Sequence, residues 1–414
     1  MLSDNLPWIR ASRNLVPPRD RGPLRVMFIL TSMGVGGAET LLVNLIRRMD
    51  RTRFAPEICC LKSLDELGEL MAAEVPAHAE LITGKYDIRV LGRLTALLRQ
   101  RRIDAIVTVG TGGDRMFWGR LAAYRAGVPV VLSAIHSTGH PDHVEWQNRL
   151  LTPLTDGFIA VARPHARHLI QNEGCPLERV YVIPNGVDTE RFRPLTPQQT
   201  LRTELGLPVE APLVAILAAL RPEKNHELFL RMAARVRDAV PQSRFLLIGD
   251  GPRRAALEQL TAELKLREEV QFLGIRQDIP QLLSAVDVVA LTSHMEANPV
   301  SILEALACEK PVVSTHVGSI GETVEDNVSG FLVPPGDEVQ FADCVVRLLQ
   351  EPLLAQRMGR AGRDHVVAHW SLDRMVEGYQ NLIYDIYASK CEPGLPLPIP
   401  VALLEPELEA ATTQ

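Results

Sequence analysis

The chain has 414 residues, of which 46% are hydrophobic, 5% aromatic and 23% charged, and its formal net charge at pH 7 is −6. This length exceeds what one compact core usually holds, so two domains are expected. The composition lacks the basic excess of a nucleic-acid-binding protein. The sequence also lacks a run of about eighteen apolar residues, as a spanning helix needs, and residues 1–23 lack the apolar stretch of a signal peptide. A cytoplasmic protein with two domains is therefore expected.

In the first half of the chain, apolar runs alternate with helical patterns. The segment 1–23 precedes the first run and is expected to be flexible. Helices are predicted over Glu39–Met49, Arg89–Arg101 and Arg163–Asn172. Because strands that alternate with helices form parallel sheets, we expect a sheet with helices on both faces. The strands of this half are predicted at Leu24–Leu30, Glu57–Leu61, Ala105–Val109, Val128–Leu132, Gly157–Val161 and Val180–Ile183.

Turn residues at 184–188 and 192–194 break this pattern, and a second alternating series follows. The predicted fold class is α/β, with two Rossmann-like domains at 24–190 and 212–370 that face each other across an interdomain cleft. A linker is expected at 191–211, a helix at 371–390 that packs back toward the N-terminal domain, and a Pro-rich tail at 391–414. The strands of this half are predicted at Leu213–Leu217, Arg244–Ile248, Glu269–Phe272, Val286–Leu291, Pro311–Ser314 and Gly330–Val333.

The six cysteines predict neither a metal site nor a disulfide framework. Cys59 and Cys60 are adjacent, and the sequence contains no CxxC pair and no zinc-ligand spacing. In a cytoplasmic protein such cysteines are expected to be reduced and buried. The other four are Cys175, Cys308, Cys344 and Cys391.

Two glutamates eight positions apart, Glu296 and Glu304, enclose a predicted helix start. Asn298 suits the N-cap, and Pro299 suits the first helical position because its missing N–H would have no partner there. The free N–H groups of the next two residues would point out of the helix end toward an anion such as a diphosphate. Glu304 then lies about 9 Å beyond the cap along the helix axis. One carboxylate on each side of a phosphate site fits a nucleotide-sugar, which has hydroxyls on both sides of its diphosphate.

Two cations, Arg221 and Lys224, follow the predicted strand Leu213–Leu217. At the carboxyl end of a parallel strand they can hold a diphosphate and offset the charge that grows on a leaving group. The alternative is a solvated surface pair.

A Gly-rich turn, Gly34–Glu39, follows the first predicted strand. The dinucleotide fingerprint would need glycine in place of Glu39, and the second strand ends at Lys62 rather than at an acidic residue, so the pattern argues against NAD. Gly36 and Gly37 are predicted to let the backbone approach a substrate or phosphate. The alternative is a tight turn that needs positive φ angles.

Three further loops directly follow predicted strands. In Gly249–Pro252, Asp250 is either a helix cap or a ligand contact. In the loop after Phe272, the backbone around Arg276 can border a nucleobase, and Asp278 is expected to cap the next helix. His136 follows Val128–Leu132 at the end of a strand, where it can contact a sugar hydroxyl or the acceptor.

In combination these motifs resemble the retaining glycosyltransferases of the GT4 family, which have the GT-B architecture. The resemblance covers residues 24–388 and is most specific in Glu296–Glu304 and its continuations, Ala305–Val313 and Gly330–Asp337. The Gly-rich first loop, the segment Asn185–Asp188 and the pair of cations also follow the order found in that family.

The resemblance implies a role for each motif. Arg221 and Lys224 would hold the donor diphosphate, Glu304 the ribose hydroxyls, and Glu296 and His136 the transferred sugar. The donor would be a UDP-sugar, with a GDP-sugar as second choice, and the acceptor a saccharide or a lipid-linked molecule, in polysaccharide or glycoconjugate biosynthesis. No cofactor or divalent metal would be required. The other predicted donor-binding residues are Gly36, Gly37, Arg276, Pro299, Val300 and Ser301.

The chain departs from the family pattern at two places. Many members have Gly-Phe-Gly after the first glutamate, whereas this chain has Ala297-Asn298-Pro299, which leaves the sugar specificity open. The usual glycine after Ala-Cys is replaced by Glu309, which is expected to alter a turn.

Several alternatives stay open at this stage. A double displacement needs a carboxylate nucleophile, whereas a same-face transfer needs only the cation pair and good positioning, and we favour the second. A sugar-nucleotide epimerase, a phosphorylase and a non-catalytic scaffold are the competing functions. The basic helical segment 89–102 either contacts the inner face of a membrane or packs one face on the sheet.

Overall fold

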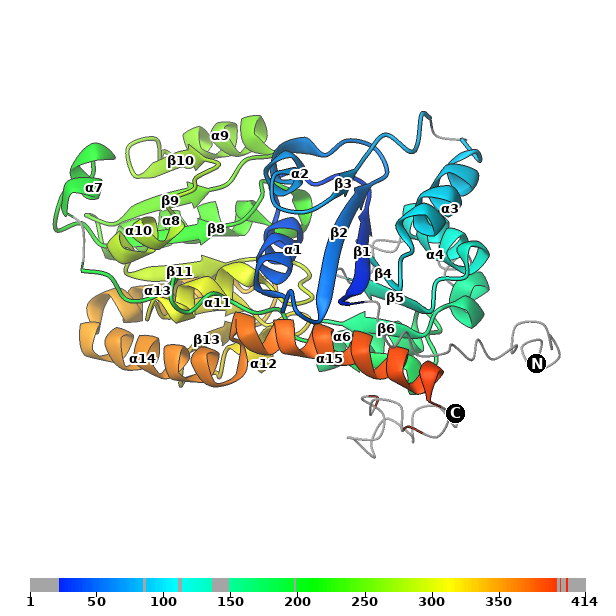
Figure 1. Cartoon of the computed structure of the whole chain (residues 1–414). Helices are drawn as coiled ribbons and strands as arrows, with labels where there is room; N and C mark the ends of the chain where they lie inside the picture. The colour runs from blue at the N-terminus through cyan, green and yellow to red at the C-terminus, as the bar shows by residue number, and fades with distance from the viewer. Residues whose placement is uncertain are drawn as a thin grey trace. The chain divides into compact units, whose positions relative to one another are not determined.

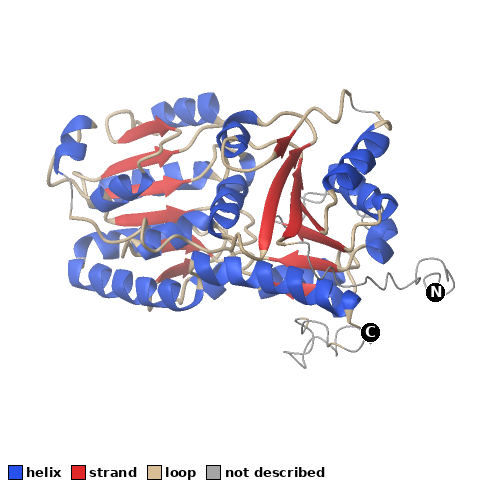
Figure 2. Cartoon of the chain, viewed as in Figure 1, coloured by secondary structure: helices blue, strands red, loops and turns tan. Residues whose placement is uncertain are grey.

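The computed structural model describes residues 22–84, 87–110, 114–135, 149–196 and 199–392, together with 395 and 400. These residues form two compact units. Unit 1 comprises the described residues up to Asn185 and from Asp373 onward, and unit 2 comprises those from Gly186 to Leu372. Figures 1 and 2 show that each unit has a parallel sheet with helices packed on its faces.

The sheet of unit 1 has seven strands in the order β3-β2-β1-β4-β5-β6-β7, and every neighbouring pair is parallel. Val26 lies opposite Pro56 on one side and Ala105 on the other. The order reverses between β1 and β4, as in Rossmann folds. The strands are β1 (Leu24–Leu30), β2 (Phe54–Cys60), β3 (Ala77–His78), β4 (Ala105–Gly110), β5 (Val130–Ile135), β6 (Gly157–Ala160) and β7 (Val180–Val182).

Helices cover both faces of this sheet. On one face α3 and α4 bury Leu94, Leu98 and Ala122 against the strands. On the other, α1 and α15 pack around Phe28. The helix α15 is held by ion pairs between Arg48 and Asp373 and between Lys390 and Asp156. The helices are α1 (Gly37–Arg48), α2 (Asp65–Ala72), α3 (Val90–Arg101), α4 (Asp114–Ala126), α6 (Arg163–Gln171), α15 (Leu372–Cys391) and the 3-10 turns η1 (Thr152–Leu154) and η2 (Leu177–Arg179).

Unit 2 repeats this topology with six parallel strands in the order β10-β9-β8-β11-β12-β13. Val214 of β8 lies opposite Phe245 on one side and Val288 on the other. The order therefore reverses between β8 and β11. The strands are β8 (Leu213–Leu217), β9 (Arg244–Ile248), β10 (Val270–Gly274), β11 (Val288–Leu291), β12 (Val312–Thr315) and β13 (Gly330–Val333).

The two faces of this sheet carry separate apolar cores. One core contains Phe229 of α8 and Phe341 of α13, and the other contains Leu283 of α10 and Ile302 of α11. The strands are mainly apolar, as expected of a parallel sheet whose two faces are both covered. The helices are α7 (Gln199–Glu204), α8 (His226–Ala239), α9 (Arg254–Glu263), α10 (Ile279–Ala285), α11 (Val300–Ala307), α12 (Ile320–Thr323), α13 (Glu338–Gln350), α14 (Pro352–His369) and the 3-10 turn η3 (Pro222–Lys224).

The structure confirms the α/β class and the two parallel sheets. The strands β1, β8, β9 and β13 have the predicted bounds, and the other predicted strands differ at their ends by a few residues. The two-residue strand β3 was not predicted, because so short a run carries no pattern. The segment 191–211, expected to be a linker, contains α7 and belongs to unit 2.

The start of α11 differs from the prediction by one residue. Pro299 is the N-cap, with extended backbone angles, and the helix begins at Val300. The side chain of Asn298 does not cap the helix. Instead its amide nitrogen lies 3.5 Å from the hydroxyl of Thr323.

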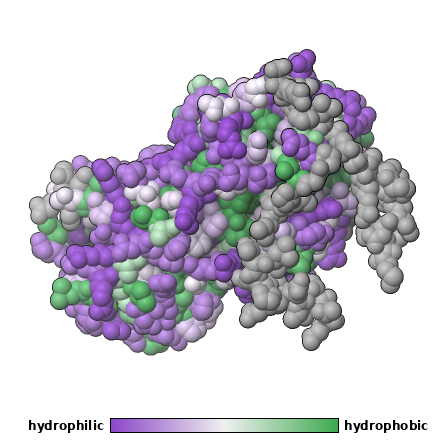
Figure 3. Space-filling model, turned by 60° about the horizontal axis from the view of Figure 1, so that its bottom comes forward, coloured by the Kyte–Doolittle hydropathy of each residue, from purple (hydrophilic) through white to green (hydrophobic). Residues whose placement is uncertain are grey.

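The six cysteines are free, as expected. Cys59, Cys60, Cys175 and Cys308 are buried, whereas Cys344 and Cys391 are half-buried. Burial raises the pKa of the Cys60 and Cys308 thiols to about 12, so both are protonated at neutral pH. Within the described part of the chain, no helix is both long and apolar enough to cross a membrane. The face of the molecule in Figure 3 is mainly polar, with separate apolar patches.

Candidate active site

Lys224 and Glu296 lie at the point of unit 2 where the strand order reverses. Lys224 follows β8, and Glu296 follows β11. These strands are parallel neighbours, so their carboxyl ends open at the same edge of the sheet (Figure 1). Ligands of open α/β sheets bind at such a reversal, because the loops diverge there and leave a crevice. The two residues thus occupy the position that the topology favours for a ligand.

The side chains of Lys224 and Glu296 form an ion pair. The ammonium Nζ of Lys224 lies 2.6 Å from Oε1 of Glu296. Glu296 is 7% exposed, whereas the Lys224 side chain is 24% exposed. Oε1 also accepts a hydrogen bond from the Ser293 hydroxyl at 2.6 Å. A buried carboxylate is costly unless it is paired and hydrogen-bonded, and Glu296 has both kinds of partner.

The loop that carries Lys224 is fixed from two sides. Asn225 adopts the left-handed conformation, with φ 48°, and caps α8 through a hydrogen bond from the Leu228 N–H. The Thr292 hydroxyl donates to the carbonyl oxygen of Asn225 at 2.9 Å. The N–H of His294 donates to the carbonyl oxygen of Glu223 at 2.8 Å. Residues that follow β11 thus hold the loop that follows β8.

Arg221 begins the same loop in an extended conformation. Its side chain is exposed and forms no ion pair within the described residues. It is therefore available to an anion from outside the chain.

The first turn of α11 presents unbonded N–H groups. Pro299 precedes the helix, and no acceptor among the described residues bonds the N–H of Val300 or of Ser301. Such groups, with the positive end of the helix dipole, favour an anion.

Glu304 lies on α11, about one and a half turns after Pro299, and part of its side chain reaches solvent. Loss of hydration in this environment disfavours the charged carboxylate and raises its pKa to about 7, whereas the positive charge of Arg191 lowers it. Near neutral pH this carboxyl group is therefore divided between two protonation states.

The predicted Arg276 is bound within its own loop. Its guanidinium forms two hydrogen bonds with the Asp278 carboxylate, at 2.8 and 2.6 Å. Asp278 is the N-cap residue of α10, as expected, but its side chain makes no capping hydrogen bond, because the Arg276 guanidinium occupies the carboxylate. Asp250 is not the cap of the next helix, α9, whose N-cap residue is Arg253. The Asp250 carboxylate accepts from the Gly251 N–H at 2.7 Å instead.

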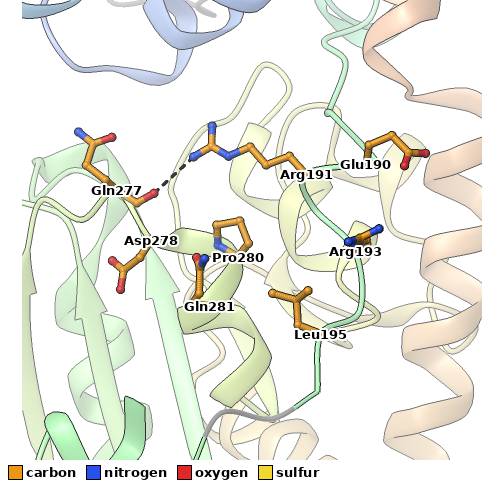
Figure 4. A pocket seen from close by; sticks show the side chains of 8 residues that line it. All are labelled: Glu190, Arg191, Arg193, Leu195, Gln277, Asp278, Pro280 and Gln281. Atoms are coloured by element: carbon orange, nitrogen blue, oxygen red, sulfur yellow. Dashed lines mark hydrogen bonds between the residues drawn. The ribbon is translucent and has the colours of Figure 1, made fainter. Parts of the chain in front are cut away.

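A cavity of about 450 Å³ lies beside this loop (Figure 4). The side chain of Arg191 extends across it, and its guanidinium donates to the carbonyl oxygen of Gln277 at 3.4 Å. Neither Lys224 nor Glu296 lines this cavity, but Arg191 connects it electrostatically to Glu304. The lining residues are Glu190, Arg191, Arg193, Leu195, Gln277, Asp278, Pro280 and Gln281.

Gly36 and Gly37 belong to unit 1, after β1. Gly36 is the N-cap of α1 with an extended conformation, and α1 begins at Gly37. Neither glycine has a positive φ angle, so the structure rules out the tight-turn alternative. Their predicted role, close approach of a ligand to the backbone, stays a prediction. His136 lies outside the described residues, and its role also stays a prediction.

Two supporting residues were not predicted from the sequence. Thr292 holds the loop that carries Lys224, and Ser293 holds Glu296. Hydroxyl residues directly after a buried strand were the available signal. The sequence did not show which groups these hydroxyls would meet. The glycines of the loop after β12 are expected from the sequence to lie against the helix that carries Glu304, and Gly318 packs against the backbone of Glu296, just before that helix.

The two halves of the chain match two family descriptions. Residues 35–191 match "Glycosyltransferase Family 4", and residues 197–365 match "Glycosyl transferases group 1".

Individual relatives agree with these matches. The chain is 28% identical to UDP-Gal:alpha-D-GlcNAc-diphosphoundecaprenol alpha-1,3-galactosyltransferase of Escherichia coli, over 76% of this chain and 84% of the relative. It is 31% identical to D-inositol 3-phosphate glycosyltransferase of Mycobacterium marinum, over 77% and 67%. Three other relatives are matched over 51–57% of their own length.

The solved structures give the same fold. HepE from Anabaena, in complex with UDP-glucose, superposes with a TM-score of 0.77 at 24% identity, over 88% of this chain and 100% of that one. This likeness assigns the GT-B fold. The chain has two parallel Rossmann-like sheets, matches both family descriptions and is 31% identical to a relative over 77% of its length. It therefore belongs to glycosyltransferase family 4.

Proposed function

We propose that this glycosyltransferase moves a sugar from a nucleotide-sugar to a saccharide or lipid-linked acceptor with retention at the anomeric carbon. The observation that carries the proposal is the Lys224–Glu296 pair at the strand reversal of unit 2. It places a cation for a diphosphate beside a carboxylate for sugar hydroxyls. The unbonded N–H groups at the start of α11, in the segment that carries Glu296, add a second anion-binding element.

Each side chain has a distinct role in the proposal. Lys224 and Arg221 bind the diphosphate, and the N–H groups of Val300 and Ser301 add to that binding. Glu296 accepts hydrogen bonds from the transferred sugar, and Glu304 accepts them from the ribose. The half-exposed position of Glu304 on α11 supports this, because a ligand can reach the carboxylate.

Other residues complete the proposed donor site. The nucleobase borders the backbone at Arg276, next to the cavity that Arg191 crosses. Gly36 and Gly37 contact the donor from unit 1, where α1 begins without a side-chain cap. His136 contacts the sugar.

We infer a UDP-sugar as the donor, with a GDP-sugar as second choice. The name of the Escherichia coli relative states UDP-Gal as donor and a diphosphoundecaprenol-linked acceptor. The Anabaena structure contains UDP-glucose. Both are donors of the inferred class, and the first also supports a lipid-linked acceptor.

The proposed chemistry is a same-face transfer. The bond from the anomeric carbon to the diphosphate oxygen breaks, a bond to the acceptor oxygen forms on the same face, and the acceptor proton passes to the leaving phosphate. Lys224 and Arg221 offset the charge that develops on this phosphate. Cations that are already in place in this way stabilise the transition state electrostatically. Because two cations serve this purpose, we propose that no resident metal is needed, and turnover should persist in excess EDTA.

We also propose that the protein contacts a membrane surface. The exposed Arg89, Arg99 and Arg102 around α3 would attract anionic lipids. Leu94 and Leu98 are buried against the sheet, so α3 would lie on the lipid surface without inserting. Co-sedimentation with anionic vesicles at low and high salt tests this. Absence of binding at low salt would remove the idea.

A donor panel tests the function itself. The thermal shift should be largest with one of the UDP-, GDP- and ADP-sugars. Release of nucleoside diphosphate from that donor should then depend on an added saccharide or lipid-linked acceptor. Isomerisation of the sugar would indicate an epimerase, and dependence on inorganic phosphate a phosphorylase. Binding without turnover would indicate a scaffold.

A further inference from the structure

The two carboxylate oxygens of Glu296 have different surroundings. Oε1 accepts from both Lys224 and Ser293, each at 2.6 Å. Among the described residues, no hydrogen bond reaches Oε2. The described residues thus bind one carboxylate oxygen of Glu296 and make no hydrogen bond to the other.

Ser293 is itself held rigidly. It is 1% exposed, and its carbonyl oxygen accepts from the Thr315 hydroxyl at 2.6 Å. Thr315 ends β12, the strand next to β11. The backbone that carries the Ser293 hydroxyl is therefore tied to the neighbouring strand of the sheet.

Lys224 cannot provide the same support during donor binding. Its ammonium is a point charge on a flexible stem, and a diphosphate competes with Glu296 for it. When Lys224 turns toward the phosphates, the Ser293 hydroxyl is the remaining observed donor to Oε1. Without it the carboxylate can rotate and lose its alignment with the sugar.

We propose that Ser293 is a positioning residue that holds Oε1 of Glu296, so that Oε2 faces the transferred sugar while Lys224 contacts the diphosphate. This inference rests on the proposed function, because it assumes a nucleotide-sugar at this site. It predicts a defect that is confined to the sugar part of the donor.

The test compares Ser293→Ala with Ser314→Ala. Ser314 is also fully buried, but among the described residues its hydroxyl bonds to the carbonyl oxygens of Leu291 and Thr315 and not to Glu296. For each variant, kcat is measured, and calorimetry gives the Kd of UDP-glucose and of UDP (or of the GDP pair, if the donor panel selects GDP). For Ser293→Ala we expect kcat to fall about tenfold or more and the affinity gained from the sugar to disappear, as loss of a hydrogen bond to a charged group implies. The Kd of the nucleoside diphosphate should stay within about threefold, and Ser314→Ala should change neither quantity.

A second variant, Ser293→Cys, keeps the size of the side chain with a much weaker donor, and it should reproduce the defect even if Ser293→Ala does not fold. An unchanged kcat in either folded variant, or equal losses of nucleotide-sugar and nucleoside-diphosphate binding, would overturn the inference alone. Failure of the wild-type protein to bind any nucleotide-sugar would overturn the proposed function and this inference together.

Discussion

Gly318 and Glu296 are packed backbone against backbone. A β-carbon at residue 318 would lie 1.7 Å from the carbonyl oxygen of Glu296, and Gly318 has a φ angle of +56°. The neighbouring Ser319 hydroxyl donates to the carbonyl oxygen of Ala297. The loop after β12 therefore supports the segment that carries Glu296, and only glycine leaves room for this contact.

Gly318→Ala should displace this segment. We expect a loss of about 2 kcal/mol or more in the free energy of unfolding and a large fall in kcat, because the backbone clash adds to the left-handed strain. Gly336→Ala is the matched control. Gly336 also has a positive φ, +86°, but no atom lies within 4 Å of its added β-carbon. Urea unfolding of both variants would separate the effect of the backbone clash from that of left-handed strain. Equal losses of unfolding free energy in Gly318→Ala and Gly336→Ala would contradict the packing argument.

Lys224→Ala should nearly abolish transfer. The variant removes the cation that offsets leaving-group charge and leaves Glu296 buried with one donor, so we expect kcat to fall about 100-fold or more and donor affinity to weaken. Steady-state kinetics and calorimetry measure both. Arg347→Ala removes an exposed cation of unit 2 that pairs with Glu351, and it should leave both quantities unchanged. Wild-type turnover in Lys224→Ala would refute the site assignment.

The stability of the ligand-free protein should depend on pH through Glu304. Its pKa is about 7 in the folded protein and ordinarily 4.5, so between these values the folded chain retains a proton that the unfolded chain has lost. The contribution of Glu304 to the free energy of unfolding is thus fully present below about pH 4.5, and it is lost as the pH rises to about 7. Glu304→Gln cannot titrate, so its Tm relative to the wild-type Tm should rise over this range. A difference in Tm that is constant from pH 4.5 to 8 would contradict the raised pKa.

Glu309→Gly should stabilise the protein. Glu309 follows α11 with a φ angle of +57°, where a side chain is unfavourable, and it stands where the family pattern has glycine. We expect a gain of about 1 kcal/mol, because the relief of left-handed strain exceeds the entropy that glycine adds to the unfolded chain. Asn327→Gly, at φ 61°, is the comparison and should gain less, because asparagine tolerates this conformation. Denaturation midpoints of the two variants and the wild-type protein measure these changes in stability. A lower midpoint for Glu309→Gly than for the wild-type protein would refute the strain argument.

Much of the fold was predictable because it depends on local patterns. The runs Leu213–Leu217 and Gly330–Val333 contain no polar side chain, and both are strands with the predicted bounds. Glu309, expected to alter a turn, has a φ angle of +57°, the left-handed conformation that glycine adopts most readily. The tight-turn alternative at Gly36 failed because glycine permits a positive φ without requiring one.

The sequence by itself determined the two α/β units and placed Lys224, Glu296 and Glu304 at the loop and helix start that follow β8 and β11. These features depend on residue type and spacing, which a linear chain carries. Only the tertiary structure decided that Lys224 pairs with Oε1 of Glu296, that Ser293 shares this oxygen, and that Gly318 supports the same segment. Such contacts join residues up to 72 positions apart, and they depend on which strands become neighbours and on how side chains rotate at their ends.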